Sequence, residues 1–262
     1  MAGKKTIMSI KDLTLTRPIA GKVLERLCFE VYEGEFLSII GSSGAGKTTL
    51  LQAMAGLIEP ESGKITFKGN EVTNPRVELG LVYQNYALFP WRTAIENVEF
   101  GLEIRNLPRD KRRQMAKEAL DLLGLLEDKD KYPIELSGGM QQRVAIAREL
   151  VNNPKVLMLD EGFSALDVQT RRELEEEMLH LQKELGLTII LVTHLVEQAL
   201  SLSDRALVLS DRKIKKTIEL SGKRPRNVDD SGFRKLLRTT ESLIRPTPKI
   251  DAFVKEMEEM ER

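Results

Sequence analysis

Short apolar runs alternate with helix-like stretches along most of the chain. The apolar run Phe36–Ile40 is followed by a glycine-punctuated turn and by residues 50–58, which have the composition of a helix that ends before Pro60. The strand-sized runs Val156–Leu159 and Thr188–Val192 come later, each beside a helical pattern. Strands that alternate with helices predict an α/β fold with a parallel sheet and crossover helices.

The second half of the chain supplies the helical patterns of this alternation. Residues 170–185 read as a polar helix ended by Gly186, and residues 195–202 read as another helix. Residues 206–209 form one more apolar, strand-like run.

Two regions depart from the alternation. The residues before Phe36 have the pattern of short antiparallel strands, which predicts a β-lobe packed against the core. Residues 94–126 read as helices and predict a helical insert. Apolar residues recur there at helical spacing, at Ala116, Ala119, Leu120 and Leu123.

These patterns give a domain prediction. The main domain is expected over residues 6–220, with a helical subdomain at about 90–150 inside it. Beyond Ile218 the pattern weakens, so residues 221–262 are expected to be a partly helical C-terminal tail. Within that tail, residues 250–262 have the pattern of a charged amphipathic helix, and a solvated tail is the alternative.

Composition narrows the function. The 262 residues carry 40 Lys and Arg against 40 Asp and Glu, so no overall field favours nucleic acid and none is expected as a partner. The single cysteine, Cys28, cannot form an internal disulfide, and two histidines make no visible metal cluster. The apolar runs are far shorter than the roughly 20 residues of a membrane-spanning helix. A protein on the cytosolic side is expected, with any membrane role coming through a partner.

A glycine-rich segment between the first parallel strand and its helix satisfies the phosphate-loop pattern, a Gly, four variable residues and then Gly-Lys-Thr. Its glycines let successive N–H groups and the helix N-terminus point at phosphates. Lys47 is expected to reach the β- and γ-phosphates of ATP, and the Thr48 hydroxyl to ligate Mg²⁺. The predicted nucleotide contacts in this segment are Gly41, Ser42, Ser43, Gly44, Ala45, Gly46, Lys47, Thr48 and Thr49.

The apolar run Val156–Leu159 ends in two carboxylates, Asp160 and Glu161, where ligands bind in open α/β sheets. Asp160 is expected near Mg²⁺, and Glu161 is placed to orient or polarise the attacking water. A strand that ends in acidic residues is common, so this motif indicates a nucleotide site only in combination with the phosphate loop. The two motifs together are compatible with kinases, GTPases, helicases and other ATPases.

The segment Leu136–Arg143, of sequence LSGGMQQR, precedes a helical pattern upstream of the Asp160 strand. The Ser137 side chain, the Gly138 and Gly139 amides and the helix dipole make a second anion site. The chain thus carries two phosphate-binding surfaces.

With this segment, residues 6–215 resemble the ABC transporter ATPase family, in which the Ser-Gly-Gly-x-Gln stretch is the signature motif. The resemblance implies that the signature of one subunit, here Ser137, Gly138, Gly139 and Gln141, closes on ATP held by the phosphate loop of another. It implies a dimer of this chain, or of this chain with a paralogous subunit, around two ATP molecules and Mg²⁺.

The same resemblance assigns three further segments. Gln84 matches the glutamine that touches Mg²⁺ or the water and passes the nucleotide state to the helical insert. Ser164–Asp167, of sequence SALD, matches the D-loop. His194 follows an apolar strand and matches the switch histidine, which would contact the γ-phosphate and hold Glu161 and the water in line. The catalytic set implied is Glu161, His194 and Gln84.

Two positions depart from the family pattern. The family stacks adenine on an aromatic residue ahead of the phosphate loop, near residues 14–18 here, yet no aromatic residue precedes Phe29. Arg17 or another loop is the proposed substitute. The residue after the catalytic glutamate is commonly proline, whereas this chain has Gly162, which frees a backbone dihedral angle.

The resemblance also implies partners. Residues 85–93 together with 96–98, and the basic stretch 223–226, are similar to the nitrate, sulfonate and taurine importer group. The implied partners are transmembrane permease subunits on the cytoplasmic side of the inner membrane and a substrate-binding protein. Transport of thiamine precursors or phospholipids stays open. So do a soluble ABC ATPase of DNA repair or translation and a regulatory protein that binds ATP without hydrolysing it.

Trp91, the only tryptophan, lies in the apolar, aromatic stretch 86–91 just after Gln84. It is expected to line the groove that receives a helix of the permease. The alternative is a buried loop anchor.

Overall fold

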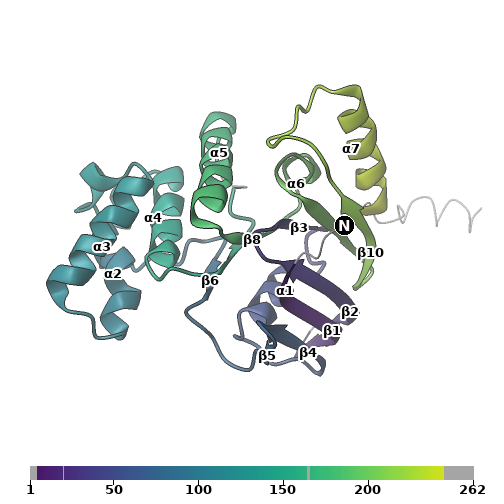
Figure 1. The fold of residues 1–262 in the computed structure, drawn as a ribbon, viewed down its shortest axis with the longest axis horizontal. Coiled ribbons are helices and arrows are strands. Elements are labelled where there is room, and N and C mark those ends of the chain that lie inside the picture. Colours follow the sequence, from purple (N-terminus) through teal and green to yellow (C-terminus); the bar gives the residue numbers. More distant parts are fainter. Residues whose placement is uncertain (1–4, 20, 164–165, 245–262) are drawn as a thin grey trace, which may run out of the picture.

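The structure is a computed structural model that describes residues 5–19, 21–163 and 166–244. It contains a mixed main sheet, a smaller antiparallel sheet and a separate group of helices (Figure 1). Two predictions lie outside the described residues: the first part of the D-loop, Ser164 and Ala165, and the C-terminal helix over residues 250–262.

The helices and strands follow one another in the order expected for a β-lobe, an α/β core and a helical insert. They are β1 (Thr6–Arg17), β2 (Gly21–Tyr32), β3 (Phe36–Ile40), α1 (Lys47–Met54), β4 (Ser62–Phe67), β5 (Asn70–Glu71), β6 (Leu79–Val82), α2 (Ala94–Ile104), α3 (Arg109–Leu122), η1 (Leu126–Asp128), η2 (Pro133–Glu135), α4 (Gly138–Leu150), β7 (Val156–Asp160), α5 (Val168–Leu185), β8 (Thr188–Thr193), α6 (Val196–Leu202), β9 (Arg205–Ser210), β10 (Lys213–Glu219) and α7 (Ser231–Ile244).

The main sheet has the strand order β10-β9-β3-β8-β7-β6. Its strands are parallel except β10, which returns antiparallel beside β9. Every residue of β3, β7 and β8 is buried, because helices cover one face and α1 with the small sheet covers the other. The predicted α/β fold with a parallel sheet is confirmed.

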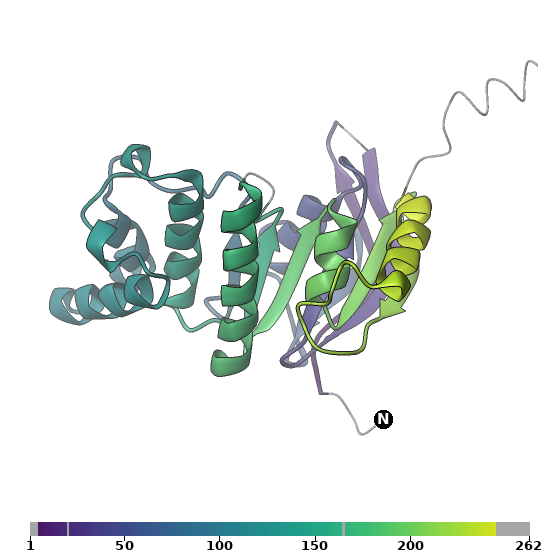
Figure 2. The same cartoon turned by 90° about the horizontal axis from the view of Figure 1, so that it is seen from above.

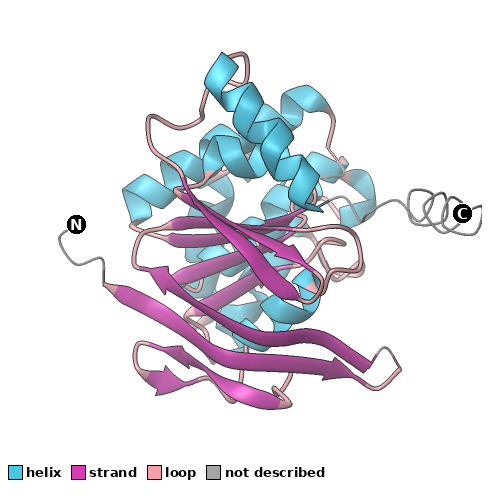
Figure 3. Cartoon of the chain, turned by 90° about the vertical axis from the view of Figure 1, so that its right-hand side faces the viewer, coloured by secondary structure: helices cyan, strands magenta, loops and turns pink. Residues whose placement is uncertain are grey.

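The antiparallel sheet forms the predicted N-terminal β-lobe, with the order β2-β1-β4-β5 (Figure 3). Leu13 and Leu15 of β1 and Leu24 and Leu27 of β2 are buried in the cluster that also contains Leu50 of α1. The lobe therefore packs on the helix that follows the phosphate loop, and this fixes its position relative to the core.

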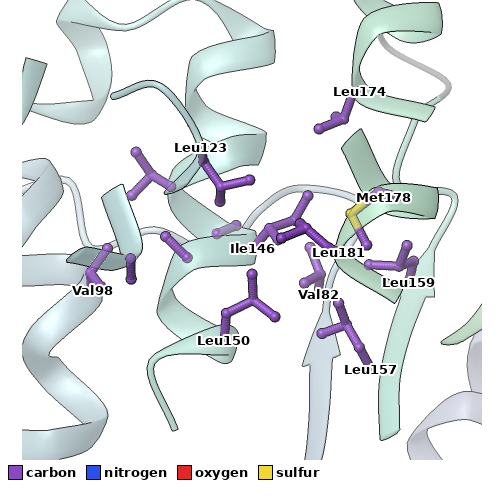
Figure 4. Packing of buried hydrophobic residues seen from close by; sticks show 14 of the residues in the cluster. Val82, Val98, Leu123, Ile146, Leu150, Leu157, Leu159, Leu174, Met178 and Leu181 are labelled. Atoms are coloured by element: carbon purple, nitrogen blue, oxygen red, sulfur yellow. The ribbon is translucent and has the colours of Figure 1, made fainter. Parts of the chain in front are cut away.

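The helical insert packs on the main sheet through α4. Figure 4 shows Ile146 and Leu150 of α4 between Val98 of α2 on one side and Val82 of β6 on the other. The buried face of α4 belongs to one continuous hydrophobic cluster with α2, α3, β6 and α5. Because protein interiors are closely packed, a displacement of the insert would also displace the residues of β6 at the sheet edge.

The region 94–126, which was predicted to form helices, contains α2 and α3. They are separate because Asn106 adopts a positive φ of 57° and Pro108, whose ring does not fit a helix interior, precedes α3. One helix boundary differs from the prediction. The first core helix begins at Lys47 and ends at Met54, short of Pro60, because Gly56 adopts φ of 77°, a left-handed conformation that ends helices. No helix in the described ranges is both long and apolar enough to cross a membrane.

The chain after residue 220 contains a helix that the sequence pattern did not locate. Helix α7 lies beside α6 over the same face of the sheet as α5 (Figure 2). Phe233 of α7 is buried in a cluster with Ile40, Leu200 and Val208. The described part of the predicted tail is thus packed onto the core, and the domain boundary at residue 220 stays a prediction.

The basic stretch before α7 caps the C-terminal end of α6. Arg226 donates hydrogen bonds from Nη1 to the carbonyls of Leu200, Ser201 and Ser203, at 2.9, 3.2 and 2.8 Å. Arg224 is paired with Asp204 at 3.1 Å. A guanidinium at a helix C-terminus satisfies carbonyls that have no partner within the helix and interacts favourably with the dipole.

Replacing Arg226 with alanine should destabilise the fold, because carbonyls at the end of α6 lose their donor. We expect Arg226→Ala to lower the free energy of unfolding by about 1.5–3 kcal/mol in urea denaturation. Arg234→Ala is the matched control, since Arg234 pairs with Asp229 at the surface; its cost should stay below about 1 kcal/mol. Equal costs for the two variants would contradict the capping role.

Candidate active site

Three neighbouring parallel strands end at one edge of the main sheet. In the register of the sheet, Ile40 at the end of β3 pairs with Thr193 of β8, and Asp160 at the end of β7 pairs with Val192. The glycine-rich loop, the Asp160–Glu161 pair and His194 leave the sheet there. Residues more than 100 positions apart in the sequence therefore meet at this edge.

The glycine-rich loop packs tightly against the β-lobe and β9. A Cβ atom on Gly46 would lie 2.7 Å from Cγ1 of Val23, and Gly46 has φ of 94°. A Cβ atom on Gly41 would lie 2.7 Å from the Leu209 carbonyl oxygen. Helix α1 begins at Lys47, directly after Gly46, so its first N–H groups face the concave side of a loop that only glycine can form at these points.

Lys47 is buried at the centre of the site, with 5% of its side chain exposed. Its ammonium donates to the carbonyls of Gly41 and Ser42 at 3.1 and 3.0 Å. It also lies 3.4 Å from a carboxylate oxygen of Glu161. A buried ammonium is held by such partners, because without them its desolvation is costly.

Thr48 and Asp160 are joined across the site. The Thr48 hydroxyl donates to Oδ1 of Asp160 at 2.9 Å. Burial raises the pKa of the Asp160 carboxyl, and the nearby Glu161 adds to the rise, while the Thr48 hydrogen bond and Lys47 oppose it. The folded protein thus keeps a carboxylate where its charge is disfavoured.

These two oxygen ligands fit Mg²⁺. The ion prefers oxygen ligands and is commonly held by one or two protein groups together with substrate phosphates. The described residues contain no cluster of three or more His, Cys, Asp or Glu that would hold a metal alone. Thr48, in the phosphate loop, and Asp160, beside it, match a site in which Mg²⁺ is held jointly by the protein and by the phosphates of a bound nucleotide.

Glu161 is the point at which the predicted catalytic residues meet. Its carboxylate lies 3.3 Å from Nδ1 of His194 and accepts a hydrogen bond of 3.3 Å from the Gln84 side-chain amide. Its backbone has φ of 48°, a left-handed conformation that is uncommon for a residue with a side chain, and its N–H donates to the Val192 carbonyl. The turn after β7 thus directs the carboxylate toward Lys47, and 15% of its side chain is exposed.

Arg17, at the end of β1, contacts Thr49 of α1. The Arg17 Nε donates to the Thr49 hydroxyl at 3.5 Å, and its Nη2 donates to the side-chain oxygen of Gln52. The guanidinium proposed to replace the adenine-stacking aromatic is therefore attached to the helix that begins in the phosphate loop. Stacking of a base on Arg17 stays a prediction.

The signature segment forms the N-terminus of α4. The Ser137 side chain caps the helix by accepting from the Met140 N–H at 3.3 Å. The Gln141 amide nitrogen donates to the carbonyls of Pro133 and Leu136, at 2.9 and 3.1 Å, which ties the helix start to η2. In the part of the chain that is described, no hydrogen bond links the signature to the phosphate loop, so one chain does not bring its two anion sites together through such contacts.

Two arginines that the sequence analysis missed hold the loops around the site. Arg148 of α4 donates to the carbonyls of Tyr86 and Ala87, just after Gln84, at 3.0 and 2.6 Å. Arg171 of α5 donates to carbonyls of the segment after Glu161, at Phe163 and Leu166. Both read in sequence as solvent-facing charges on helices, and nothing local marks them as loop anchors.

The fold and site define a phosphate-loop nucleotide-binding protein of the ABC ATPase fold. A family model described as "ABC transporter" matches residues 24–164, and the chain belongs to the ABC transporter ATP-binding family. It is 45% identical over 228 residues to an uncharacterized ABC transporter ATP-binding protein of Methanocaldococcus jannaschii, covering 85% of each chain. It is 43% identical to the nitrate import ATP-binding protein NrtD of Synechocystis sp., covering 78% of this chain and 79% of the relative. These relatives confirm the resemblance to the nitrate importer group.

Solved structures agree with the family. A dimeric, post-hydrolysis ATP-binding cassette bound to ADP and Pi has a TM-score of 0.75 and 32% identity, covering 83% of this chain and all of that chain. The structure of cbiO1 from Clostridium perfringens, described as part of the ABC transporter complex cbiONQ, has a TM-score of 0.77 and 28% identity, covering 96% of this chain and all of that chain.

Replacing Asp160 with asparagine should stabilise the protein in the absence of nucleotide. Because the pKa of Asp160 is raised in the folded state, the ionised form costs stability above that pKa, and this cost disappears as the pH falls toward the ordinary value of 3.8. We therefore expect Asp160→Asn to have the higher Tm at neutral pH, with a gap that narrows on acidification. Calorimetric scans over a pH series measure this gap.

Asp211→Asn serves as the control of opposite sign. A hydrogen bond from Lys215 lowers the pKa of Asp211, so the charged form is favoured at this exposed position. Its replacement should not raise Tm at neutral pH. A lower Tm for Asp160→Asn at every pH would show that its carboxylate is not held at a cost.

Proposed function

We propose that the chain is the ATP-hydrolysing subunit of a membrane ABC importer, forming a dimer around two ATP molecules and driving substrate movement through permease subunits. The observation that carries the proposal is the convergence of Lys47, Gln84 and His194 on the Glu161 carboxylate. Hydrolysis of ATP to ADP and phosphate needs a cation for the phosphates and a carboxylate for the water in one place.

Binding of ATP is expected to exchange the partners of Lys47. The loop N–H groups and the α1 N-terminus bind the phosphates, and Lys47 turns from Glu161 to the β- and γ-phosphate oxygens. Thr48, Asp160 and Gln84 would hold Mg²⁺, which would supply charge stabilisation for the phosphates. Glu161 is then free of its cation and orients or polarises the attacking water.

His194 and Gln84 hold that water in line. His194 keeps 42% of its side chain exposed, so it is accessible to a γ-phosphate while Nδ1 stays beside Glu161. Gln84 already donates to Glu161, and it lies at the start of the segment that Arg148 of α4 anchors. A change at the nucleotide is therefore passed to the helical insert.

The signature segment is proposed to complete the site of a second subunit. Ser137, Gly138, Gly139 and Gln141 lie at the start of α4 and have no hydrogen bond to the phosphate loop within the described chain. A pair of subunits in opposite orientation places each α4 N-terminus over the partner's ATP. The solved relatives described as dimeric support this arrangement.

An importer is favoured over the alternatives by the relatives. Besides the nitrate import protein, a spermidine/putrescine import ATP-binding protein of Marinobacter nauticus is 45% identical, although the chain covers 56% of its length. We propose a small anion or organic solute as the cargo, permeases and a substrate-binding protein as partners, and a position on the cytoplasmic face of the inner membrane. A soluble repair or translation ATPase and a lipid transporter remain the second candidates, and no feature of the site favours them.

The permease is proposed to dock at Trp91. The side chain is 70% exposed, so it is not the buried loop anchor considered as its alternative. Its ring lies 5.5 Å from that of Phe89, and with Arg92, Glu99 and Arg113 it lines a hollow of about 380 Å³ at the insert. An exposed aromatic beside charged groups is typical of an interface.

Glu161→Gln should trap the dimer. The amide retains the shape but not the charge that acts on water, so hydrolysis should fall by about 10²–10⁴-fold while ATP still binds. We expect gel filtration with ATP and Mg²⁺ to move this variant from monomer to dimer. Lys47→Ala is the comparison, since it should lose affinity for a fluorescent ATP analogue. A monomer of Glu161→Gln at saturating ATP would argue against the sandwich.

Trp91→Ala should weaken assembly with the permease without unfolding the subunit. Because the side chain is mostly exposed, the free energy of unfolding should change by no more than about 0.5 kcal/mol, and ATPase activity should be retained. Leu185→Ala, at an exposed apolar residue at the end of α5, is the control and should keep assembly. Pull-down of the permease by each variant measures assembly, and we expect reduced capture by Trp91→Ala alone. Normal capture by Trp91→Ala would exclude this docking surface.

A further inference from the structure

Gln142 is a fully buried polar residue on the signature helix. Its relative exposure is 0%, and neither Nε2 nor Oε1 has a hydrogen-bond partner among the described residues. A buried amide without partners destabilises a fold, whereas a methionine of similar volume does not carry that cost. Its neighbour Gln141 uses its own amide to tie the helix to η2, so helix geometry does not require a second amide here.

The Gln142 amide lies against the residue that follows the catalytic carboxylate. A Cβ atom on Gly162 would be 3.1 Å from Nε2 of Gln142. Gly162 is itself buried, and it connects Glu161, in its left-handed conformation, to Phe163. A side chain at position 162 would therefore fit only if the amide shifted slightly, and the amide lies beside the residue that directly follows Glu161.

Other contacts keep α4 and this segment together. A Cβ atom on Gly139 would be 2.7 Å from Cγ2 of Thr170, so α4 and the start of α5 approach closely. Arg171 of α5 holds the carbonyls of Phe163 and Leu166. These contacts hold the residues that follow Gly162. A displacement of α4 would therefore reach Glu161 through the contact between Gln142 and Gly162.

We infer that Gln142 is a positioning residue for Glu161: its buried amide, which has no hydrogen-bond partner among the described residues, packs against Gly162 and forms a hydrogen bond to the peptide there during ATP hydrolysis, which fixes the direction of the Glu161 carboxylate. The inference rests on the proposed function. In the sandwich dimer it makes α4 a direct link from the signature, which closes on the partner's ATP, to the catalytic carboxylate of its own subunit. Glycine at position 162 fits this arrangement, since a Cβ atom there would lie 3.1 Å from the amide nitrogen and would require it to shift.

The test separates positioning from packing. We expect Gln142→Met to lower kcat by about tenfold while KM for ATP stays unchanged and Tm is equal to or higher than that of the wild type. A residue with a purely structural role would lose Tm together with activity. Gln182→Met is the matched control, because Gln182 is also buried but donates to the Gly34 carbonyl at 2.8 Å; it should lose Tm and keep kcat.

A double-mutant cycle locates the contact. Gly162→Ala should lower kcat in the wild-type background and have little further effect with Gln142→Ala, because the shorter side chain leaves room for the new methyl group. Additive losses would overturn the inference, as would wild-type kcat in Gln142→Met. Failure of the proposed function is a separate outcome: the wild type itself would show no ATPase activity, and Glu161→Gln would show no ATP-dependent dimer.

Discussion

The ammonium group of Lys47 is almost completely shielded from water. The other groups of the site must therefore supply the partners that this buried charge needs. The carbonyls of Gly41 and Ser42 and the carboxylate of Glu161 surround the ammonium. Taking such a charge out of water is costly unless partners replace the water. Phosphate oxygens are stronger partners than carbonyls, so the pocket that satisfies Lys47 in the protein is also one that ATP can enter by exchange.

The same edge of the sheet holds groups at a cost to stability. The Asp160 carboxyl has its pKa raised by burial, Glu161 has a left-handed backbone, and the Gln142 amide is buried without a partner among the described residues. Strain and unsatisfied polar groups are characteristic of sites where function outweighs stability. These groups are concentrated at the end of β7, in the turn after it and on the helix beside it.

Much of this was visible in the sequence, for physical reasons. The buried strands are continuous apolar runs. Two glycines of the phosphate loop stand where a Cβ atom would have a neighbour within 3 Å: the Leu209 carbonyl oxygen at Gly41 and side chains of the lobe at Gly46. The anchoring residues Arg148 and Arg226 were not predicted, because their carbonyl partners are more than 20 residues away in the sequence. The partners of Arg171, Phe163 and Leu166, are nearby in the sequence, but a turn that exposes its carbonyls to an arginine has no residue pattern of its own. Helix α7 was not located, although its apolar residues Phe233, Leu236, Leu237 and Leu243 recur at helical spacing and pack in one cluster.

The central claim is that each ATP site is built from two subunits, and mixing two inactive variants tests it most directly. Lys47→Ala disables the phosphate loop, and Ser137→Arg disables the signature by filling the α4 N-terminus with a cation. A mixed dimer contains one site in which the intact phosphate loop of one subunit meets the intact signature of the other. The account predicts that ATPase activity absent from either variant alone returns on mixing. Activity that stays at the average of the two separate variants would contradict it.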